Sequence, residues 1–229
     1  MTMLKRIPRE RAARLIAEAR RLPQSDPATR YPAWYLHRWH FLPEGYLSRR
    51  SAAGYDRGIR QLYNAGVEQE LIKKLTHRIA AARPPSVIEL GCGPGRLLTA
   101  LADSRVARRI VGVDLSPYLL ERAQHRLGPC DVTLMHADAT ETPEPDGAFD
   151  AAVAAHYIGH LPESLRPRAV QELARLVRPG GQVVVADHAW HPWPGHALLA
   201  LRHASRHASG LIKLQVFERL ESRDTGATP

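Results

Sequence analysis

The sequence has few cysteines and no long apolar run. Its two cysteines, Cys92 and Cys130, are too few for a disulfide framework, and neither stands in a spacing typical of zinc ligands. No stretch of about 18 apolar residues occurs, and the N-terminal region is charged throughout, which argues against a membrane span and a secretory signal. We therefore expect a soluble, cytoplasmic protein whose cysteines are reduced thiols.

Acidic residues are scarce in the first third of the chain. Residues 1–83 contain 17 lysines and arginines against seven acidic residues, whereas the remainder contains 15 against 16. The same segment contains eight of the 14 aromatic residues. Such a surface could meet nucleic acid, an anionic membrane or an acidic substrate, or it could be a solvated basic face above packed aromatic rings. Composition alone leaves these alternatives open.

The N-terminal third has helical patterns interrupted by prolines. Apolar residues recur at helical spacing over residues 8–22 and again over 51–82, and the prolines between 22 and 43 predict loops. Pro84 and Pro85 end the last helical pattern. We therefore expect an N-terminal helical cap, residues 1–83, followed by a core domain of residues 84–229.

Short apolar runs alternate with helical patterns after Pro85. Five strand candidates (87–90, 110–115, 132–138, 149–155 and 182–187) are separated by helix candidates that include 96–104, 117–127 and 165–177. Alternation of this kind predicts an α/β fold with a mostly parallel, doubly wound Rossmann-like sheet.

The C-terminal segment predicts a shortened strand region. Residues 196–209 favour a helix, and the alternation of Ile212, Leu214 and Val216 with polar residues favours one added antiparallel strand. His196, His203 and His207 would share a face of that helix. A single helix presents such residues too far apart to converge on one ion, so we expect no metal site.

A glycine-rich turn follows the first predicted strand. The segment from Gly91 to Gly95, hereafter the glycine loop, stands between a strand and a helix, where doubly wound sheets bind nucleotide-like ligands. Asp114 ends the next strand, where a carboxylate can accept hydrogen bonds from ribose hydroxyls. Asp138 follows the third strand and is placed to accept from an adenine amino group.

Five segments in order, VIELGCGPGRLL, VGVDLSPYLLERA, HADATETP, FDAAVAAHYIGHL and LARLVRPGGQVVVAD, resemble the successive motifs of class I S-adenosylmethionine-dependent methyltransferases. The resemblance implies S-adenosylmethionine as the cofactor. It implies contacts to the methionine part, the ribose, the adenine and the flank of the cofactor from Glu89, Gly91, Cys92, Gly93, Asp114, Leu115, Asp138, Ala139 and Ala155. The competing nicotinamide interpretation expects GxGxxG, whereas the spacing here is GxGxG.

Methyl transfer requires the acceptor to be held in line with the donor, and a base only if the acceptor must lose a proton. His156 and His160 follow the fourth strand and are the candidate bases, although both could serve packing alone. Aromatic residues of the cap could roof the acceptor pocket or form an aromatic core; the candidates for acceptor binding are Tyr31, Tyr35, Trp39 and Tyr55.

The expected acceptor is a small or lipid-like molecule. Residues 51–75 resemble the entry helices of quinone and phospholipid methyltransferases. An RNA or other nucleic-acid methyltransferase is the first alternative, disfavoured because AHYIG replaces an Asn/Asp-Pro-Pro-Tyr motif. A second alternative binds S-adenosylmethionine without methyl transfer. Peripheral membrane contact and a monomer or homodimer fit the sequence.

Overall fold

The computed structural model describes residues 5–39, 42–62, 66–188, 201–209 and 212–220. The helices are α1 (Arg9–Ala19), α2 (Arg49–Leu62), α3 (Gly66–Ala80), α4 (Arg96–Asp103), α5 (Pro117–Leu127) and α6 (Arg166–Leu176), with short 3-10 turns η2 (Ile158–His160) and η3 (Glu163–Leu165). The strands are β1 (Ser86–Leu90), β2 (Arg109–Asp114), β3 (Val132–His136), β4 (Phe149–Ala155), β5 (Val177–His188), β6 (Leu201–Ser209) and β7 (Ile212–Arg219). All five strands and three helices predicted for the core before Asp187 are confirmed.

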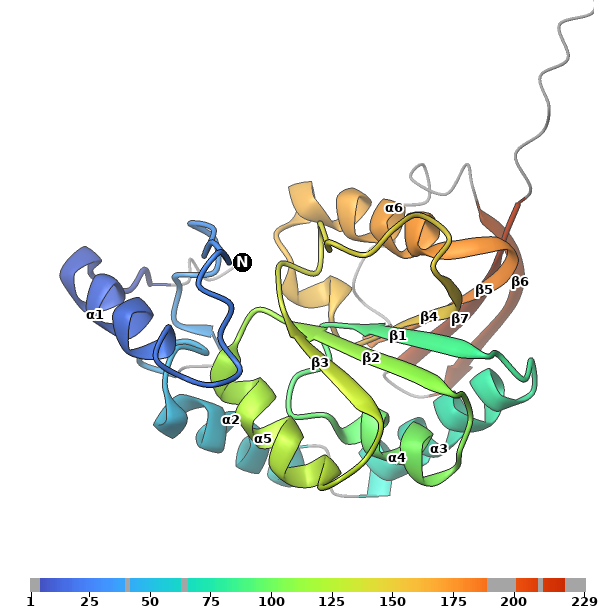
Figure 1. Cartoon of the computed structure of the whole chain (residues 1–229), viewed down its shortest axis with the longest axis horizontal. Helices are drawn as coiled ribbons and strands as arrows, with labels where there is room; N and C mark the ends of the chain where they lie inside the picture. Colours follow the sequence, from blue (N-terminus) through green and yellow to red (C-terminus); the bar gives the residue numbers. More distant parts are fainter. Residues whose placement is uncertain (1–4, 40–41, 63–65, 189–200, 210–211, 221–229) are drawn as a thin grey trace, which may run out of the picture.

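The strands form one sheet in the order β3-β2-β1-β4-β5-β7-β6. Every pairing from β3 across to β5 is parallel, and β7 runs antiparallel to both of its neighbours, β5 and β6. Helices α3, α4 and α5 lie along one face of the sheet and α6 along the other (Figure 1). The predicted doubly wound, mostly parallel α/β fold is therefore confirmed.

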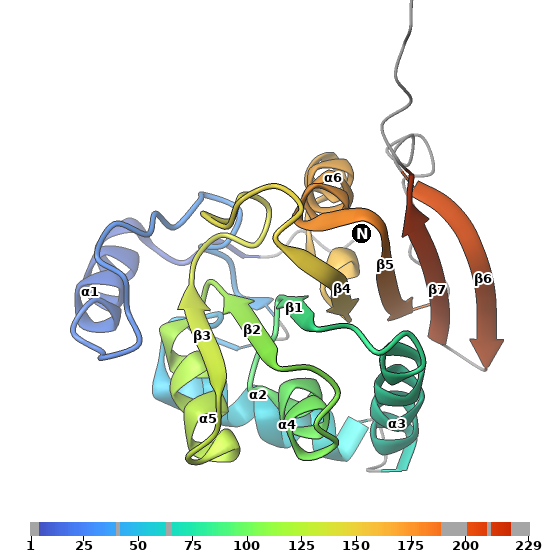
Figure 2. The ribbon, with the colours of Figure 1, turned by 45° about the vertical axis from the view of Figure 1, so that its right-hand side comes forward.

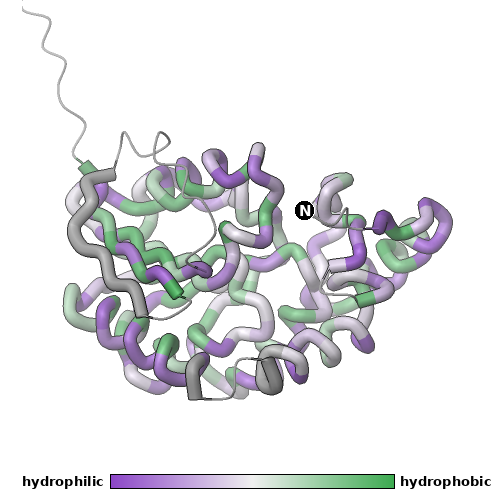
Figure 3. The backbone as a smooth tube through the Cα atoms, turned by 180° about the vertical axis from the view of Figure 1, so that it is seen from behind, coloured by the Kyte–Doolittle hydropathy of each residue, from purple (hydrophilic) through white to green (hydrophobic). Residues whose placement is uncertain are grey.

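The central strands are apolar because helices cover both faces of the sheet. Val87, Ile88 and Leu90 of β1 are fully buried, as is the run from Ala151 to Ala154 in β4. Figure 3 shows hydrophobic stretches along the inner strands. Two apolar clusters, one on each face, share these strands and form the core.

Helix α5 begins with a side-chain hydrogen bond at its N-cap residue, Ser116. The side chain of Ser116 accepts a hydrogen bond from the backbone N–H of Leu119, and Pro117 occupies the first turn. The hydroxyl of Ser116 also donates to the backbone oxygen of Tyr46, 2.7 Å away. Ser116 therefore begins helix α5 and also links it to the N-terminal helical cap, residues 1–83.

Strand β5 contains an irregularity at the RPGG segment. Phe149 pairs with Val177, yet Ala151 pairs with Gln182, so residues 178–181 bulge out of register. A Cβ on Gly181 would lie 2.6 Å from the backbone oxygen of Asp150, which no larger residue could tolerate. The RPGG turn thus has a structural role.

The C-terminal prediction was wrong in two respects. Residues 201–209, predicted as part of a helix over 196–209, form strand β6, and His196 lies outside the described residues. The strand over 212–219 is present as β7, but it forms an antiparallel hairpin with β6 instead of a shortened single strand (Figure 2). Hydrogen bonding to β7 outweighs the weak helical pattern of a polar segment.

The cap (residues 1–83) contributes to two kinds of packing. Helix α1, the following aromatic loop and α2 lie at the end of the sheet where β1, β2 and β3 finish (Figure 1). Helix α3 packs differently, because Leu71, Leu75 and Ile79 join the cluster formed by β1 and α4. This last part of the cap is continuous with the core. Within the described ranges, no helix combines the length and apolar character that crossing a bilayer requires.

Candidate functional site

A cavity opens at the carboxyl ends of the parallel strands, beneath the cap, with about 80 Å³ of space for water-sized molecules. Strand ends, α5, the loop after β4 and the cap all contribute lining residues: Trp34, Tyr35, Trp39, Tyr46, Tyr55, Gly91, Gly93, Asp114, Leu115, Leu119, Asp138, Ala139, His156, Tyr157, His160 and Leu161.

The glycine loop has three residues in the left-handed region, with φ of +70° at Gly91, +52° at Gly93 and +75° at Gly95. A Cβ on Gly91 would lie 2.4 Å from the Tyr157 ring, and one on Gly95 would lie 2.8 Å from the Cβ of Ala123. A Cβ on Gly93 would meet nothing within 4 Å. Gly91 and Gly95 therefore permit packing, whereas Gly93 leaves space open to the cavity.

Asp114 joins the glycine loop to the start of α5. Its Oδ2 accepts a hydrogen bond from the N–H of Gly93 and its Oδ1 accepts one from the N–H of Ser116, both 2.8 Å long. Burial raises the pKa of Asp114 to about 6, although these backbone bonds favour the charged form. The carboxylate faces the cavity and is fixed in orientation.

Glu89 is a buried carboxyl group in β1, two residues before the glycine loop. Only 3% of its surface is exposed, and Oε2 has no hydrogen-bond partner among the described residues. Burial, with the nearby charge of Asp114, raises the pKa of Glu89 to about 8. An unsatisfied buried oxygen of this kind is costly, which is typical of a site that receives a ligand.

Asp138 follows β3 and forms a local turn. Its Oδ1 accepts hydrogen bonds from the backbone N–H and the hydroxyl of Thr140, at 2.9 and 2.8 Å. Asp138 and Ala139 both line the cavity. The two residues therefore form the part of the cavity wall that follows β3.

Histidines gather at the ends of β4 and β5. His156 adopts φ +53°, an uncommon conformation for a non-glycine residue, and its ring centroid lies 4.9 Å from that of His188. His160 lies in turn η2, which the carboxylate of Asp187 holds by accepting a 2.6 Å hydrogen bond from the N–H of Gly159. Local strain at such a position is characteristic of functional sites.

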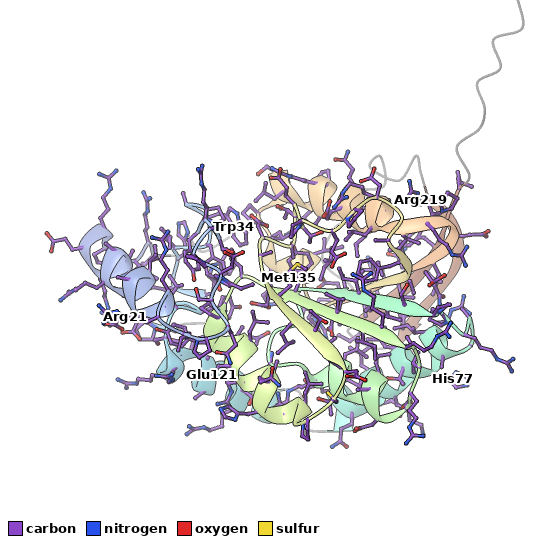
Figure 4. The ribbon with its side chains drawn as sticks, in the orientation of Figure 1. Arg21, Trp34, His77, Glu121, Met135 and Arg219 are labelled. Atoms are coloured by element: carbon purple, nitrogen blue, oxygen red, sulfur yellow. The ribbon has the colours of Figure 1, made fainter. Side chains whose placement is uncertain are left out.

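Aromatic side chains of the cap form the roof of the cavity. Trp34 stacks edge-on against Tyr35 (5.6 Å) and Trp39 (6.3 Å), and Tyr46 against Tyr55 (5.3 Å). Trp34 extends from the cap toward the sheet and packs, as Met135 does, against the apolar cluster on one face of the sheet (Figure 4). The roof is therefore a connected aromatic layer over the strand ends.

The structure brings most, but not all, of the predicted site residues to the cavity. The predicted residues that line it are Gly91, Gly93, Asp114, Leu115, Asp138, Ala139, His156, His160, Tyr35, Trp39 and Tyr55. Glu89, Cys92 and Ala155 are not among the lining residues. Tyr31 does not line the cavity, because its hydroxyl contacts Nε2 of His136 at 3.2 Å.

Tyr46, one of the cap aromatics expected to form a roof, also lines the cavity. Four lining residues have no counterpart among the predicted site residues: Trp34, Leu119, Tyr157 and Leu161. Tyr157 directly follows His156, and its buried hydroxyl has no hydrogen-bond partner in the described part of the chain. Its position directly after β4 is the sequence feature that could have predicted Tyr157 as a site residue. The described residues contain no group of three side chains able to hold a metal ion.

Comparison with known proteins matches residues 87–181 to the methyltransferase domain family. This span contains the glycine loop, Asp114, Asp138 and both candidate bases. The matched segment covers less than half of the chain.

Similar methyltransferases include two bacterial enzymes. A phosphatidylethanolamine N-methyltransferase of Cereibacter sphaeroides is 34% identical over 130 residues, covering 55% of this chain and 62% of that protein. A demethylmenaquinone methyltransferase of Clavibacter sepedonicus is 31% identical over 144 residues, covering 62% of this chain and 57% of that protein. The matched region thus spans less than two thirds of each relative.

A solved methyltransferase has the same fold. The magnesium protoporphyrin IX methyltransferase of Synechocystis PCC 6803, whose crystal structure contains S-adenosylmethionine, superposes with a TM-score of 0.61 at 17% identity. The superposition covers 72% of this chain and 91% of that one. The likeness in fold therefore extends beyond residues 87–181.

Proposed function

We propose that this protein transfers a methyl group from S-adenosylmethionine to a small acceptor with an apolar or lipid-like body. The observation that carries the proposal is the composition of one cavity. Its floor consists of the glycine loop, Asp114 and Asp138, and its roof consists of cap aromatics. A polar floor fits the cofactor, and an aromatic roof fits an apolar acceptor.

The residues present fit S-adenosylmethionine. Gly93 leaves open space beside the loop, and the buried, unpartnered Oε2 of Glu89 can accept a hydrogen bond on the amino side of the methionine part. Asp114 is placed for the ribose hydroxyls and Asp138 for the adenine amino group. When bound, the cofactor supplies a methyl group activated on a sulfonium sulfur.

The chain's own contribution is to position the acceptor and to receive a proton. The aromatic roof excludes water and orients a flat or apolar acceptor by ring contacts. His156 or His160, at the end of β4, accepts a proton from an acceptor hydroxyl or amine as the new bond forms. The role of each histidine is part of the proposal.

The names of the relatives support the acceptor class. One acts on phosphatidylethanolamine and the other on a demethylmenaquinone, both molecules with large apolar parts. The cap, with its excess of basic residues, then serves as the acceptor-side lid and as a surface that can approach an anionic bilayer. In this proposal the protein acts as a monomer or homodimer and needs no nucleic acid.

The proposal is tested with methyl-labelled S-adenosylmethionine and a cell extract separated into lipid, small-molecule and RNA fractions. We expect label to enter the lipid or small-molecule fraction with wild-type protein and not with Asp114→Ala. Label in the RNA fraction alone would contradict the acceptor class. No transfer to any fraction, despite cofactor binding, would favour a protein that binds S-adenosylmethionine without methyl transfer.

A further inference from the structure

A buried carboxylate on cap helix α2 contacts three arginines of the methyltransferase core. Asp56 is 4% exposed. Its Oδ1 accepts a hydrogen bond of 2.7 Å from Arg96 at the start of α4, and its Oδ2 accepts one of 3.1 Å from Nε of Arg122 on α5. Arg126, one turn further along α5, contacts both carboxylate oxygens at 3.2 and 3.1 Å.

These arginines also contact the glycine loop. Nη1 of Arg126 donates a hydrogen bond to the backbone oxygen of Pro94, which stands between Gly93 and Gly95. Arg96 directly follows Gly95 and donates to the backbone oxygen of Asp56 as well, at 3.3 Å. The cap is thus linked to the glycine loop through two side chains that share one carboxylate.

The charge of Asp56 is required for this arrangement. Burial by itself would raise the pKa of the Asp56 carboxyl group, but hydrogen bonds from Arg122 and Arg96 and the charge of Arg126 lower it to about 2. Helix α4 has no acidic residue in its first turn, and an arginine there is unfavourable to the helix dipole. Glu68 of α3 also pairs with Arg96 at 3.3 Å, but without the Asp56 carboxylate the guanidinium groups of Arg122 and Arg126 would repel each other beside the loop.

We propose that Asp56 is a positioning residue that couples seating of the cap to the conformation of the glycine loop. When α2 packs against the core, Asp56 holds the Arg126 side chain in its hydrogen bond to the backbone oxygen of Pro94, and this bond fixes the loop conformation that binds the cofactor. Because coupling between two sites is reciprocal, cofactor binding in turn strengthens the packing of the cap on the core. The cavity therefore closes over the acceptor when the cofactor is in place. This inference rests on the proposed function of the cavity.

The test compares three variants with the wild-type full chain. Asp56→Asn removes the charge, and Arg126→Gln removes the link to Pro94 together with one of the three arginine partners of Asp56, while Asp56 keeps Arg96 and Arg122. Glu121→Gln is the matched control, because Glu121 on α5 (labelled in Figure 4) pairs with Arg49 of α2 at 2.7 Å without contacting the loop. Calorimetry measures S-adenosylmethionine affinity, and hydrogen exchange without ligand measures protection of the backbone amides of residues 91–93, 95 and 96.

We expect Asp56→Asn and Arg126→Gln to weaken S-adenosylmethionine binding about tenfold and to speed exchange in the glycine loop, while Glu121→Gln changes neither. Wild-type affinity and loop protection in both variants would overturn the coupling, and so would equal effects in the control. If Asp56→Asn does not fold, Arg126→Gln decides the question. If the wild type binds no S-adenosylmethionine, the proposed function fails, whereas the exchange rates still test the link between cap and loop.

Discussion

Two glycines of one loop allow packing and cofactor access to be separated experimentally. Gly91 and Gly93 both have positive φ, +70° and +52°, so alanine at either position carries backbone strain of about 1–2 kcal/mol. The positions differ in their surroundings. A Cβ at Gly91 would overlap the Tyr157 ring at 2.4 and 2.7 Å, whereas a Cβ at Gly93 would point into open space.

The expected magnitudes follow from this difference. Overpacking in a closed region adds about 1–3 kcal/mol, so Gly91→Ala should lower the free energy of unfolding by about 2–5 kcal/mol. Gly93→Ala should lower it by only about 1–2 kcal/mol, the strain alone. Because the methyl group at residue 93 would occupy space assigned to S-adenosylmethionine, Gly93→Ala should nonetheless weaken cofactor binding more than about tenfold.

Urea unfolding gives the stabilities and calorimetry gives the affinities. The reasoning would be refuted if Gly93→Ala destabilised the protein as much as Gly91→Ala does. It would also be refuted if Gly93→Ala bound S-adenosylmethionine as tightly as the wild type, because the space beside Gly93 would then not receive the cofactor.

Three further predictions concern charge, catalysis and packing. Folding raises the pKa of Glu89 from 4.5 to about 8, so the folded state binds this proton more tightly than the unfolded state does. The free energy of unfolding should therefore fall as pH rises from 4.5 to 8, by at most about 5 kcal/mol. Glu89→Gln should flatten that pH dependence in urea titrations, and an unchanged profile would contradict the assignment. Whichever of His156 and His160 is the base, its alanine variant should keep cofactor affinity and lose roughly 100-fold in turnover, and normal turnover in both variants would exclude a histidine base. Leu75 of α3 is fully buried in the core cluster, so Leu75→Ala should cost about 2–5 kcal/mol in urea unfolding, and a loss below about 1 kcal/mol would place α3 outside the core.

The core strands could be predicted because their burial determines their composition. A parallel strand covered on both faces is apolar along most of its length, as β1 and β4 are despite Glu89 and Asp150, and such runs are visible in the sequence. Strand β6 could not be predicted in this way. Its sequence, LRHASRHAS, is polar, and its strand conformation depends on pairing with β7.

The cofactor side of the site was easier to predict than the acceptor side. The glycine loop, Asp114 and Asp138 stand at the ends of successive parallel strands, which topology brings to one edge. The roles assigned to these residues remain predictions. Trp34 and Tyr157 meet the cavity only because the cap folds over that edge, and Asp56 meets Arg126 across 70 positions of sequence. No local sequence pattern predicts contacts between residues that are so far apart in the chain.

Calorimetric titration with S-adenosylhomocysteine, with NAD as the comparison ligand, is the most direct test of the proposed cofactor site. One molecule of S-adenosylhomocysteine should bind per chain, and Asp114→Ala should weaken binding at least about tenfold, because it removes charge-assisted hydrogen bonds to the ribose. NAD should not bind. Binding of NAD without S-adenosylhomocysteine, or an Asp114→Ala variant with wild-type affinity, would contradict the assignment of the cavity.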